Sequence, residues 1–348
     1  MSLRFASAVY LIVPVLLLNF TVPLRAADPE QTASRLLTPA ARQAADRALR
    51  FLAQRQTDEG SFSRGPNIDG RNVGVCGLAG LAFMSSGSTP GRGPYGVNIN
   101  RCVDYLLANT QENGFISKRE SSSHGPMYGH GFATLFLAEV YGMSPRVDLR
   151  DQLARAVKLI VDTQNDQGGW RYQPQRRDAD LSVTICQVMA LRAAKNSGIF
   201  VPNETIERCV AYVKQSQNAD GGFMYTLDGG GPSDFPRSAA GIVALYSAGI
   251  YEGDEIERGL GYLMRFRPSA PSRLNQAHFF YGHYYAVQAM WHAGDGYWEN
   301  WYPAIRDQLI ARQSEDGAWV NSTCPEYGTA MAAIVLQLPN NCLPILQR

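Results

Sequence analysis

Four of the five histidines of this chain occur in two local groups whose side chains could do proton or metal chemistry. The first group is His124 and His130, and the second is His278 and His283. Neutral histidine can exchange protons near pH 7 and can ligate a metal ion. Histidines at helix starts can equally be hydrogen-bonded parts of the fold, because polar groups near a core are normally paired. The residue types leave both interpretations open.

Aromatic residues surround the second histidine group. They run from Phe279 to Tyr285 and are followed by Trp291, and Phe132 lies close to the first group. Such rings could line a cavity for an apolar or aromatic ligand. Packing in the core is the alternative, because buried rings contribute large burial energies. The candidate ligand-binding residues are His130, Phe132, His283, Tyr284, Tyr285 and Trp291.

These side chains belong to a repeated unit of about fifty residues. A phrase of glutamine, a few residues, glycine and an aromatic residue, which we call the Gln phrase, begins at Gln56, Gln111, Gln164, Gln217 and Gln313. The first four glutamines are 55, 53 and 53 residues apart, and the next gap of 96 leaves room for two somewhat shorter units. A fixed period of this length indicates stacked units that cannot bury their apolar faces alone. The chain is therefore predicted to contain six units.

Each unit is predicted to contain two helices joined by a glycine-rich turn. An amphipathic segment leads into the Gln phrase, as in residues 157–163, where apolar residues recur at helical spacing. A turn follows, because glycine tolerates the positive φ of a helix C-terminus. The next segment, such as 239–245, is apolar on most sides and belongs in an interior. The fold class is therefore all-α, with six outer and six inner helices in two rings.

The starts of the six inner helices can be aligned on one polar or thiol-bearing position. Successive members are 54, 54, 54, 45 and 46 residues apart, and we call them the anchor positions: Cys76, His130, Thr184, Ser238, His283 and Thr329. The hydroxyl groups of Thr184 and Ser238 are expected to cap their helices by accepting free backbone N–H groups. His130 and His283, in the second and fifth units, should lie on opposite sides of the ring, which disfavours one shared metal ion.

The Gln phrase resembles the repeat motif of the α/α toroids of squalene and diterpene cyclases and of protein prenyltransferase β subunits. The resemblance covers roughly residues 40 to 338 and rests on five copies of the phrase. It implies an (α/α)6 toroid in which side chains such as Gln164 and Trp170 tie adjacent repeats together. It also implies that an apolar ligand would be isoprenoid. The motif is specific for the fold and not for the chemistry, since one fold hosts many functions.

Class II terpene cyclases, which the chain resembles, protonate their substrate with an Asp-x-Asp-Asp motif at the start of an inner helix. The matching stretch contains Asp178 and Asp180, the candidate catalytic residues, but Leu181 replaces the last aspartate. Asp180 falls where the family places its proton donor. Asp234 lies 54 residues further on at the equivalent repeat position. Both Asp180 and Asp234 could therefore simply interact with the dipole at a helix N-terminus.

Two related chemistries are missing from the sequence. Protein prenyltransferases bind zinc through Asp-x-Cys, and here Ser182 stands in place of the cysteine after Asp180. Thioester proteins with this fold carry Cys-Gly-Glu-Gln, and the matching stretch that begins at Cys76 lacks the glutamine. The six cysteines show no metal-binding spacing, and their pairing stays open. No metal site and no cofactor are therefore predicted.

Composition and the N-terminal residues bear on partners and location. The net charge is +1 at pH 7 and there is no basic run, which disfavours nucleic acid as a partner. Residues 1–27 combine a short charged lead, an apolar core and small residues, the pattern of a secretory signal peptide. The apolar run is short for a membrane span and contains Pro14, so no stable membrane anchor is expected. Residues 28–40 are expected to form a polar segment before the toroid at 41–348. The mature protein is expected to be exported.

Two functions are consistent with these features. The first is a secreted toroid that binds a hydrophobic, isoprenoid-like molecule or a protein partner through the open end of the ring, without the family's standard catalysis. The second is a terpene cyclase-like enzyme acting on a polyprenyl or triterpene substrate, with Asp180 as the acid. The incomplete acid motif and the single toroid favour the first, because the cyclases that the chain resembles use a second helical domain.

Overall fold

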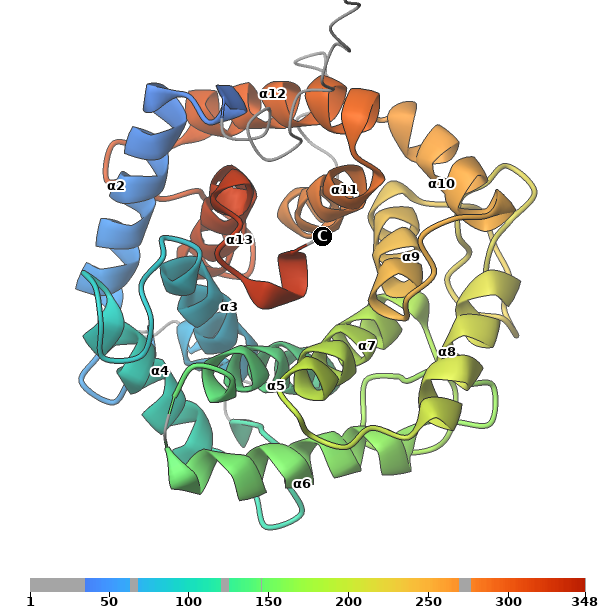
Figure 1. Ribbon diagram of the computed structural model, residues 1–348, viewed down its shortest axis with the longest axis horizontal. Helices are drawn as coiled ribbons and strands as arrows, with labels where there is room; N and C mark the ends of the chain where they lie inside the picture. The colour runs from blue at the N-terminus through green and yellow to red at the C-terminus, as the bar shows by residue number, and fades with distance from the viewer. Residues whose placement is uncertain (1–34, 63–67, 120–124, 145, 269–276, 348) are drawn as a thin grey trace, which may run out of the picture.

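The computed structural model describes residues 35–62, 68–119, 125–144, 146–268 and 277–347 of the chain, and over these residues twelve α-helices form two concentric rings (Figure 1). The outer ring contains α2 (Pro39–Arg55), α4 (Gly96–Ala108), α6 (Val147–Thr163), α8 (Asn203–Gln215), α10 (Asp254–Met264) and α12 (Asp295–Arg312). The inner ring contains α3 (Val73–Met84), α5 (Pro126–Tyr141), α7 (Leu181–Asn196), α9 (Phe235–Ser247), α11 (Phe279–Ala293) and α13 (Pro325–Gln337). Three 3-10 helices complete the described elements: η1 (Asp69–Arg71), η4 (Leu338–Asn340) and η5 (Pro344–Leu346). The predicted all-α toroid of six helix pairs is confirmed.

The composition of each helix explains its place in the two rings. All twelve residues of α3 are buried, so this helix is apolar on every side and suits the inner ring. The buried side chains of α6 include Leu149, Leu153, Ala156, Val157 and Ile160. Their spacing of three and four residues places them on one face of the helix. Outer helices such as α6 therefore cover the inner ring with one apolar face each.

In four of the repeats, the glutamine of the Gln phrase joins the repeat to the next outer helix. Gln164 Nε2 donates to Gly168 O, which closes its own turn, and to Thr205 O in α8 of the next repeat, both at 2.8 Å. The same pair of bonds is made by Gln56, Gln217 and Gln313. Gln313 Nε2 donates to Ala44 O in α2 at 2.8 Å, so the sixth repeat is tied to the first outer helix and the ring is closed.

The indole N–H of the phrase's aromatic residue bonds within its own repeat, and the expectation that this residue ties adjacent repeats together stays a prediction. Trp170 is buried, and its indole N–H donates to Ile160 O in α6 at 2.7 Å. Trp319 makes the equivalent bond to Leu309 O in α12 at 2.9 Å. The indole therefore fastens each of these turns to the outer helix that precedes it.

Four of the six anchor positions accept a backbone N–H of the preceding turn and not that of their own helix. Thr184 Oγ1 accepts from Trp170 N at 3.1 Å. Ser238 Oγ accepts from Phe223 N at 2.9 Å. The equivalent bonds elsewhere run to Thr329 from Trp319 N and to His130 from Ile116 N. The prediction that Thr184 and Ser238 cap their helices is therefore wrong, because each is the fourth residue of its helix and bonds sideways to the turn.

One copy of the Gln phrase is shifted by one residue from its predicted place. An isolated bridge pairs Thr110 with Ile116. In the fourth repeat the equivalent bridge pairs Gln217 with Phe223. Thr110 therefore occupies the glutamine position of the second repeat, and Gln111 is exposed. The predicted copy is wrong, because its glutamine lies one residue after the position that the turn geometry uses.

The C-terminal tail, residues 338–347, closes one end of the ring and lies inside the inner helices (Figure 1). The N–H of Ile345 donates to Glu139 Oε2 of α5 at 3.2 Å. Trp291 Nε1 of α11 donates to Leu346 O at 2.8 Å. Both partners lie near the C-terminal ends of inner helices, so the tail covers that end.

Glu139→Gln is expected to remove a pH dependence of stability. Burial raises the pKa of the Glu139 carboxyl from its ordinary 4.5 to about 7. The folded protein therefore keeps a proton that the unfolded chain releases, and the free energy of unfolding falls as pH rises from about 4.5 to about 7. Glutamine can still accept from Ile345 and cannot ionise, so at pH 8 the variant should be more stable by as much as roughly 3 kcal/mol.

Urea unfolding of the wild type and of Glu139→Gln at pH 5 and pH 8 measures this difference. Glu112→Gln, at an exposed position, is the matched control and should keep the wild-type pH slope. Equal slopes for Glu139→Gln and the wild type would contradict the prediction.

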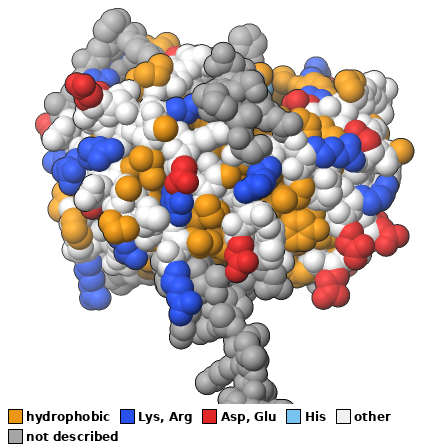
Figure 2. Space-filling model, turned by 90° about the horizontal axis from the view of Figure 1, so that it is seen from above, with side chains coloured by type: hydrophobic (Ala, Val, Ile, Leu, Met, Phe, Trp, Pro, Cys, Tyr) orange, Lys and Arg blue, Asp and Glu red, His pale blue; other side chains and the backbone are white. Residues whose placement is uncertain are grey.

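The expectation that the protein is exported rests on residues 1–27. Residues 1–34 lie outside the described part of the chain. The signal peptide at 1–27 therefore stays a prediction. Among the described residues, no helix combines the length and apolarity needed to cross a bilayer. On the face seen in Figure 2, basic, acidic and apolar side chains are interspersed, and neither sign of charge dominates.

Candidate functional site

Five partly buried tyrosines lie at the end of the ring opposite the tail, where the inner helices begin. We call them the mouth tyrosines: Tyr128, Tyr172, Tyr225, Tyr281 and Tyr327. The ring centroids of Tyr128 and Tyr172 are 6.1 Å apart, and the hydroxyls of Tyr172 and Tyr225 are hydrogen-bonded to each other. The pKa of Tyr281 is raised by burial and, among other neighbours, by Tyr128 and Tyr327. The five side chains therefore form one group drawn from five repeats.

Asp180 is the buried acid of this group. It precedes α7, and its Oδ1 accepts from Val183 N at 2.9 Å. Its other oxygen, Oδ2, is buried and has no hydrogen-bond partner among the described residues. Burial raises the pKa of the Asp180 carboxyl to about 6. After burial, the charge of Asp180 contributes to the raised pKa values of Tyr128, Tyr225 and Tyr281, which places the acid beside three mouth tyrosines.

Arg171 brings the two candidate catalytic aspartates to one guanidinium group. Its Nε lies 3.8 Å from Asp180 Oδ2, and its Nη1 lies 2.9 Å from Asp178 Oδ2. The same guanidinium lies over the rings of Tyr172 and Tyr225, at 4.9 and 5.4 Å from their centroids. Asp178 is exposed, so only Asp180 combines a buried carboxyl with this neighbourhood.

The repeat-equivalent aspartate has a different environment. Asp234 precedes α9 as Asp180 precedes α7, but the Asp234 side chain makes no capping hydrogen bond. It is 50% exposed, and its Oδ2 lies 3.8 Å from Arg237 Nη1. Asp180 and Asp234 therefore occupy equivalent positions in their repeats, as their 54-residue spacing indicates, but their environments differ.

Beneath the mouth, aromatic side chains from opposite inner helices meet in the centre of the ring. Phe132 of α5 and Tyr284 of α11 are buried and pack edge to face, with centroids 6.1 Å apart. The hydroxyl of Tyr285 in α11 lies 3.4 Å from Cys186 Sγ in α7. Cys186 is a buried free thiol. Phe132, Tyr284 and Tyr285 are thus brought together as a packed layer below the mouth tyrosines.

The two anchor histidines contact different outer helices. His130 Nδ1 accepts from Ile116 N at 3.2 Å, and its Nε2 lies 3.3 Å from Ala156 O in α6. The ring of His283 packs against Trp301 in α12, with centroids 5.9 Å apart. Burial lowers the pKa of His130 to about 4 and that of His283 to about 3, so both rings are neutral at pH 7. A ligand role for the two histidines stays a prediction.

Trp291 lies at the end that the tail covers. Besides its bond to Leu346 O, its ring packs edge to face on Trp298 of α12, with centroids 4.8 Å apart. The structure therefore separates the six predicted ligand-binding residues. Phe132, Tyr284 and Tyr285 form the central layer, which adjoins the mouth. The two histidines contact outer helices, and Trp291 contacts the tail.

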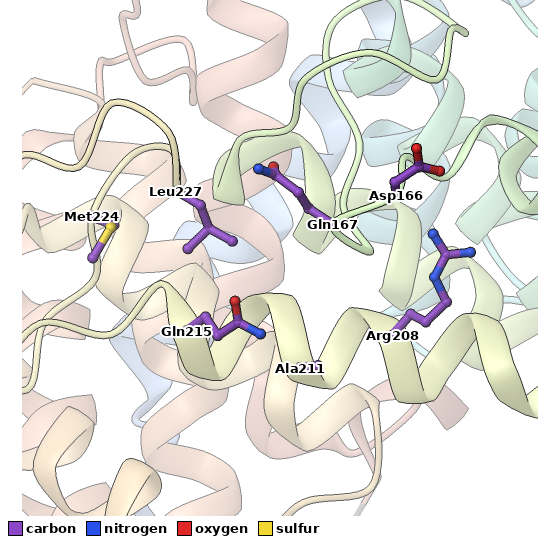
Figure 3. A pocket seen from close by; sticks show the side chains of 7 residues that line it. All are labelled: Asp166, Gln167, Arg208, Ala211, Gln215, Met224 and Leu227. Atoms are coloured by element: carbon purple, nitrogen blue, oxygen red, sulfur yellow. The ribbon is translucent and has the colours of Figure 1, made fainter.

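One open pocket lies on the outer side of the ring (Figure 3). It has a volume of about 720 Å³ and is lined by Asp166, Gln167, Arg208, Ala211, Gln215, Met224 and Leu227. These residues come from α8 and from the turns that follow α6 and α8, and no mouth tyrosine lines the pocket. None of its side chains has a buried polar atom without a partner, so the pocket lacks the unsatisfied group that Asp180 presents.

None of the mouth tyrosines was among the candidate ligand-binding residues, although Tyr281 lies in the aromatic run and the repeats carry a signal for all five. Tyr128, Tyr281 and Tyr327 each lie two residues before an anchor position. Tyr172 and Tyr225 each lie two residues after the aromatic residue of a Gln phrase. Comparing the neighbours of the repeated positions, and not those positions alone, would have identified both sets.

Comparison with protein families gives one match. The model described as the prenyltransferase alpha-alpha toroid domain matches residues 32–170 and 149–234. No curated protein sequence shows significant similarity to the chain.

Solved structures share the fold at low sequence identity. The type II terpene cyclase MstE from Scytonema, in complex with geranylgeranyl dihydroxybenzoate, superposes with a TM-score of 0.61 at 14% identity, covering 89% of this chain and 100% of that chain. An inactive variant of an α-1,6-mannanase of Salegentibacter sp., in complex with α-1,6-mannotetrose, has a TM-score of 0.62 at 9% identity, covering 86% and 98%. An α-amylase from Clostridium perfringens has a TM-score of 0.58 at 13% identity, covering 85% and 97%. At these identities the likeness shows the fold alone.

Proposed function

Because the chain belongs to the prenyltransferase α/α toroid family, we propose that it binds a hydrophobic, isoprenoid-like ligand at the mouth of its ring. The observation that carries this proposal is the position of Asp180 at the end of the ring opposite the tail, beside Tyr128, Tyr225 and Tyr281. Its Oδ2 lies 3.8 Å from Arg171 Nε, and the Arg171 guanidinium lies over the rings of Tyr172 and Tyr225. Tyrosine rings supply apolar faces and their hydroxyls supply polar contacts, which suits a site for an amphipathic small molecule. The terpene cyclase that shares the fold holds a geranylgeranyl substrate, which supports this ligand class.

The proposed ligand lies across the mouth and not deep in the ring. The packed layer of Phe132, Tyr284 and Tyr285 forms the floor on which it would rest. Leu181, in place of the last aspartate of the cyclase motif, supports binding without the family's standard catalysis. The predicted signal peptide would place this binding protein outside the cytoplasm.

Tyr225→Ala is expected to weaken the binding of farnesol by roughly 5- to 150-fold, because losing an aromatic face removes about 1–3 kcal/mol of apolar contact. Tyr225→Phe keeps the ring and should retain most of the affinity. Tyr251, a tyrosine that is 47% exposed after α9, provides the matched control, and Tyr251→Ala should bind like the wild type. Isothermal titration calorimetry measures all four proteins. Unchanged affinity in Tyr225→Ala would contradict binding at the mouth.

A cyclase-like activity is the second candidate function, and one observation favours it. Asp180 combines full burial, an unpaired Oδ2 and a pKa raised to about 6, so an appreciable fraction of the acid is protonated near neutral pH. In this reaction the proton of Asp180 would add to an alkene carbon of a polyprenyl or triterpene substrate. Asp178 and Arg171 would stand beside the conjugate base, and the tyrosine faces would stabilise the carbocation.

Asp180→Asn should abolish any cyclisation, because the amide keeps the bond from Val183 N and loses the acidic proton. Incubation with squalene or farnesol, followed by mass spectrometry of the products, tests this, and Asp234→Asn is the matched control. Wild-type protein that returns both compounds unchanged would exclude this activity on them and leave binding as the function.

A further inference from the structure

The buried Oδ2 of Asp180 lacks a hydrogen-bond donor. Asp180 is 0% exposed, and its Oδ1 is already used by Val183 N at 2.9 Å. Arg171 Nε stands 3.8 Å from Oδ2, beyond hydrogen-bond distance. An unpaired buried carboxylate oxygen is destabilising, and native structures keep few such atoms without a reason. A donor group on a bound ligand would supply the missing bond.

A cationic donor fits this position poorly. The faces of Tyr172 and Tyr225, which would otherwise attract a cation, already carry the Arg171 guanidinium at 4.9 and 5.4 Å. A second cation at Asp180 Oδ2 would lie within a few ångströms of that guanidinium and would be repelled by it.

An anionic head group fits the position poorly as well. Among the described residues, the ion pairs around Tyr172 and Tyr225 involve three carboxylates and two guanidinium groups: Asp178, Asp180, Asp234, Arg171 and Arg237. Each guanidinium already faces a carboxylate, since Arg171 lies 2.9 Å from Asp178. Arg237 lies 3.8 Å from Asp234. A phosphate would therefore add negative charge where negative charge is already in excess, beside a buried carboxyl.

We propose that the ligand carries a neutral hydroxyl group, which donates its proton to Asp180 Oδ2 in a hydrogen bond. This inference rests on the proposed binding function and adds the head group, which makes the ligand an isoprenoid alcohol and not an isoprenoid diphosphate. The apolar chain would lie on the faces of the mouth tyrosines. Arg171 Nε, 3.8 Å from the same oxygen, is close enough to contact the hydroxyl oxygen in return.

Three probes with one apolar chain separate the possible head groups: farnesol, farnesyl methyl ether and farnesyl diphosphate. The ether can accept a hydrogen bond but cannot donate one. Wild-type protein is expected to bind farnesol roughly 10- to 100-fold more tightly than the ether, the range for one hydrogen bond to a charged group. It should also bind farnesol more tightly than the diphosphate. Titration calorimetry at pH 7.5 measures the three affinities.

Asp180→Asn provides the decisive variant. The bond from Val183 N requires an acceptor, so the amide oxygen replaces Oδ1 and the NH2 group replaces Oδ2. That NH2 can donate to an alcohol or an ether oxygen alike, and the preference for farnesol should fall to about onefold. Asp234→Asn should keep the wild-type preference. Circular dichroism confirms that both variants are folded.

The outcomes distinguish the head group from the binding function. Equal binding of the alcohol and the ether by the wild type, tighter binding of the diphosphate, or an unchanged preference in Asp180→Asn would each overturn the hydroxyl assignment while leaving the mouth as a binding site. Failure of all three probes to bind the wild type would overturn the proposed function itself.

Discussion

Replacing Gly168 with alanine is expected to destabilise the toroid by about 2–6 kcal/mol, from about 1–3 for backbone strain and about 1–3 for overpacking. Gly168 has a φ of +97°, and a Cβ atom there would lie 2.2 Å from Arg208 O in α8. No side-chain rotation relieves this contact, because the oxygen belongs to a helix backbone. The turn must move away from the next repeat, which breaks the 2.8 Å bond from Gln164 to Thr205 O.

Gly198→Ala is the matched control for this substitution. Gly198 has a φ of +90°, but no atom lies within 4 Å of the position of its Cβ. Its replacement should therefore cost only the strain, about 1–3 kcal/mol. Urea unfolding followed by circular dichroism measures both variants. If Gly168→Ala proved as stable as Gly198→Ala, the close approach of the turn to α8 would not be a determinant of stability.

Trp170→Ala is expected to reduce the free energy of unfolding by about 3–5 kcal/mol, the usual cost of removing a large buried aromatic side chain. Trp170 is 1% exposed, and its indole also donates to Ile160 O at 2.7 Å. The substitution therefore leaves a cavity and removes the bond that fastens the turn to α6.

Trp170→Phe separates the two contributions. Phenylalanine occupies the equivalent position in two other repeats, at Phe62 and Phe223, so its ring suits this environment. The variant loses the bond to Ile160 and part of the ring, and it should cost only about 1–2 kcal/mol. Thermal and urea unfolding of the two variants provide the test. A nearly neutral Trp170→Ala would contradict the structural role of the indole.

The fold could be predicted because its determinants recur along the chain. Four anchor residues, which differ in type, accept the same backbone N–H: His130, Thr184, Ser238 and Thr329. The regular spacing of these residues along the sequence therefore indicated that they occupy one equivalent position in each repeat. The error at Gln111 arose because a repeated letter was taken for a repeated position. The backbone of that turn places Thr110 where the other repeats have glutamine.

The site could be predicted only in part, because burial depends on residues that are distant in sequence. Asp180 and Asp234 are equivalent by spacing, yet one is fully buried and the other is half exposed. The difference comes from packing against other repeats, which the local pattern does not contain. The tail is a second example, since the bond between Ile345 and Glu139 joins residues 206 positions apart. No periodicity predicts such a contact.

The bond from Gln313 to Ala44 in α2 closes the ring and therefore affects how the protein unfolds. In linear helical arrays the two terminal repeats each have one free face, and fraying can begin there. In this protein the described repeats form a circuit, since α13 packs against both α2 and α3. Removing any one repeat would expose two interfaces at once, and no terminal repeat offers a starting point for partial unfolding. We therefore expect unfolding to be all-or-none, with a cooperativity that belongs to the whole circuit and not to its separate helix pairs.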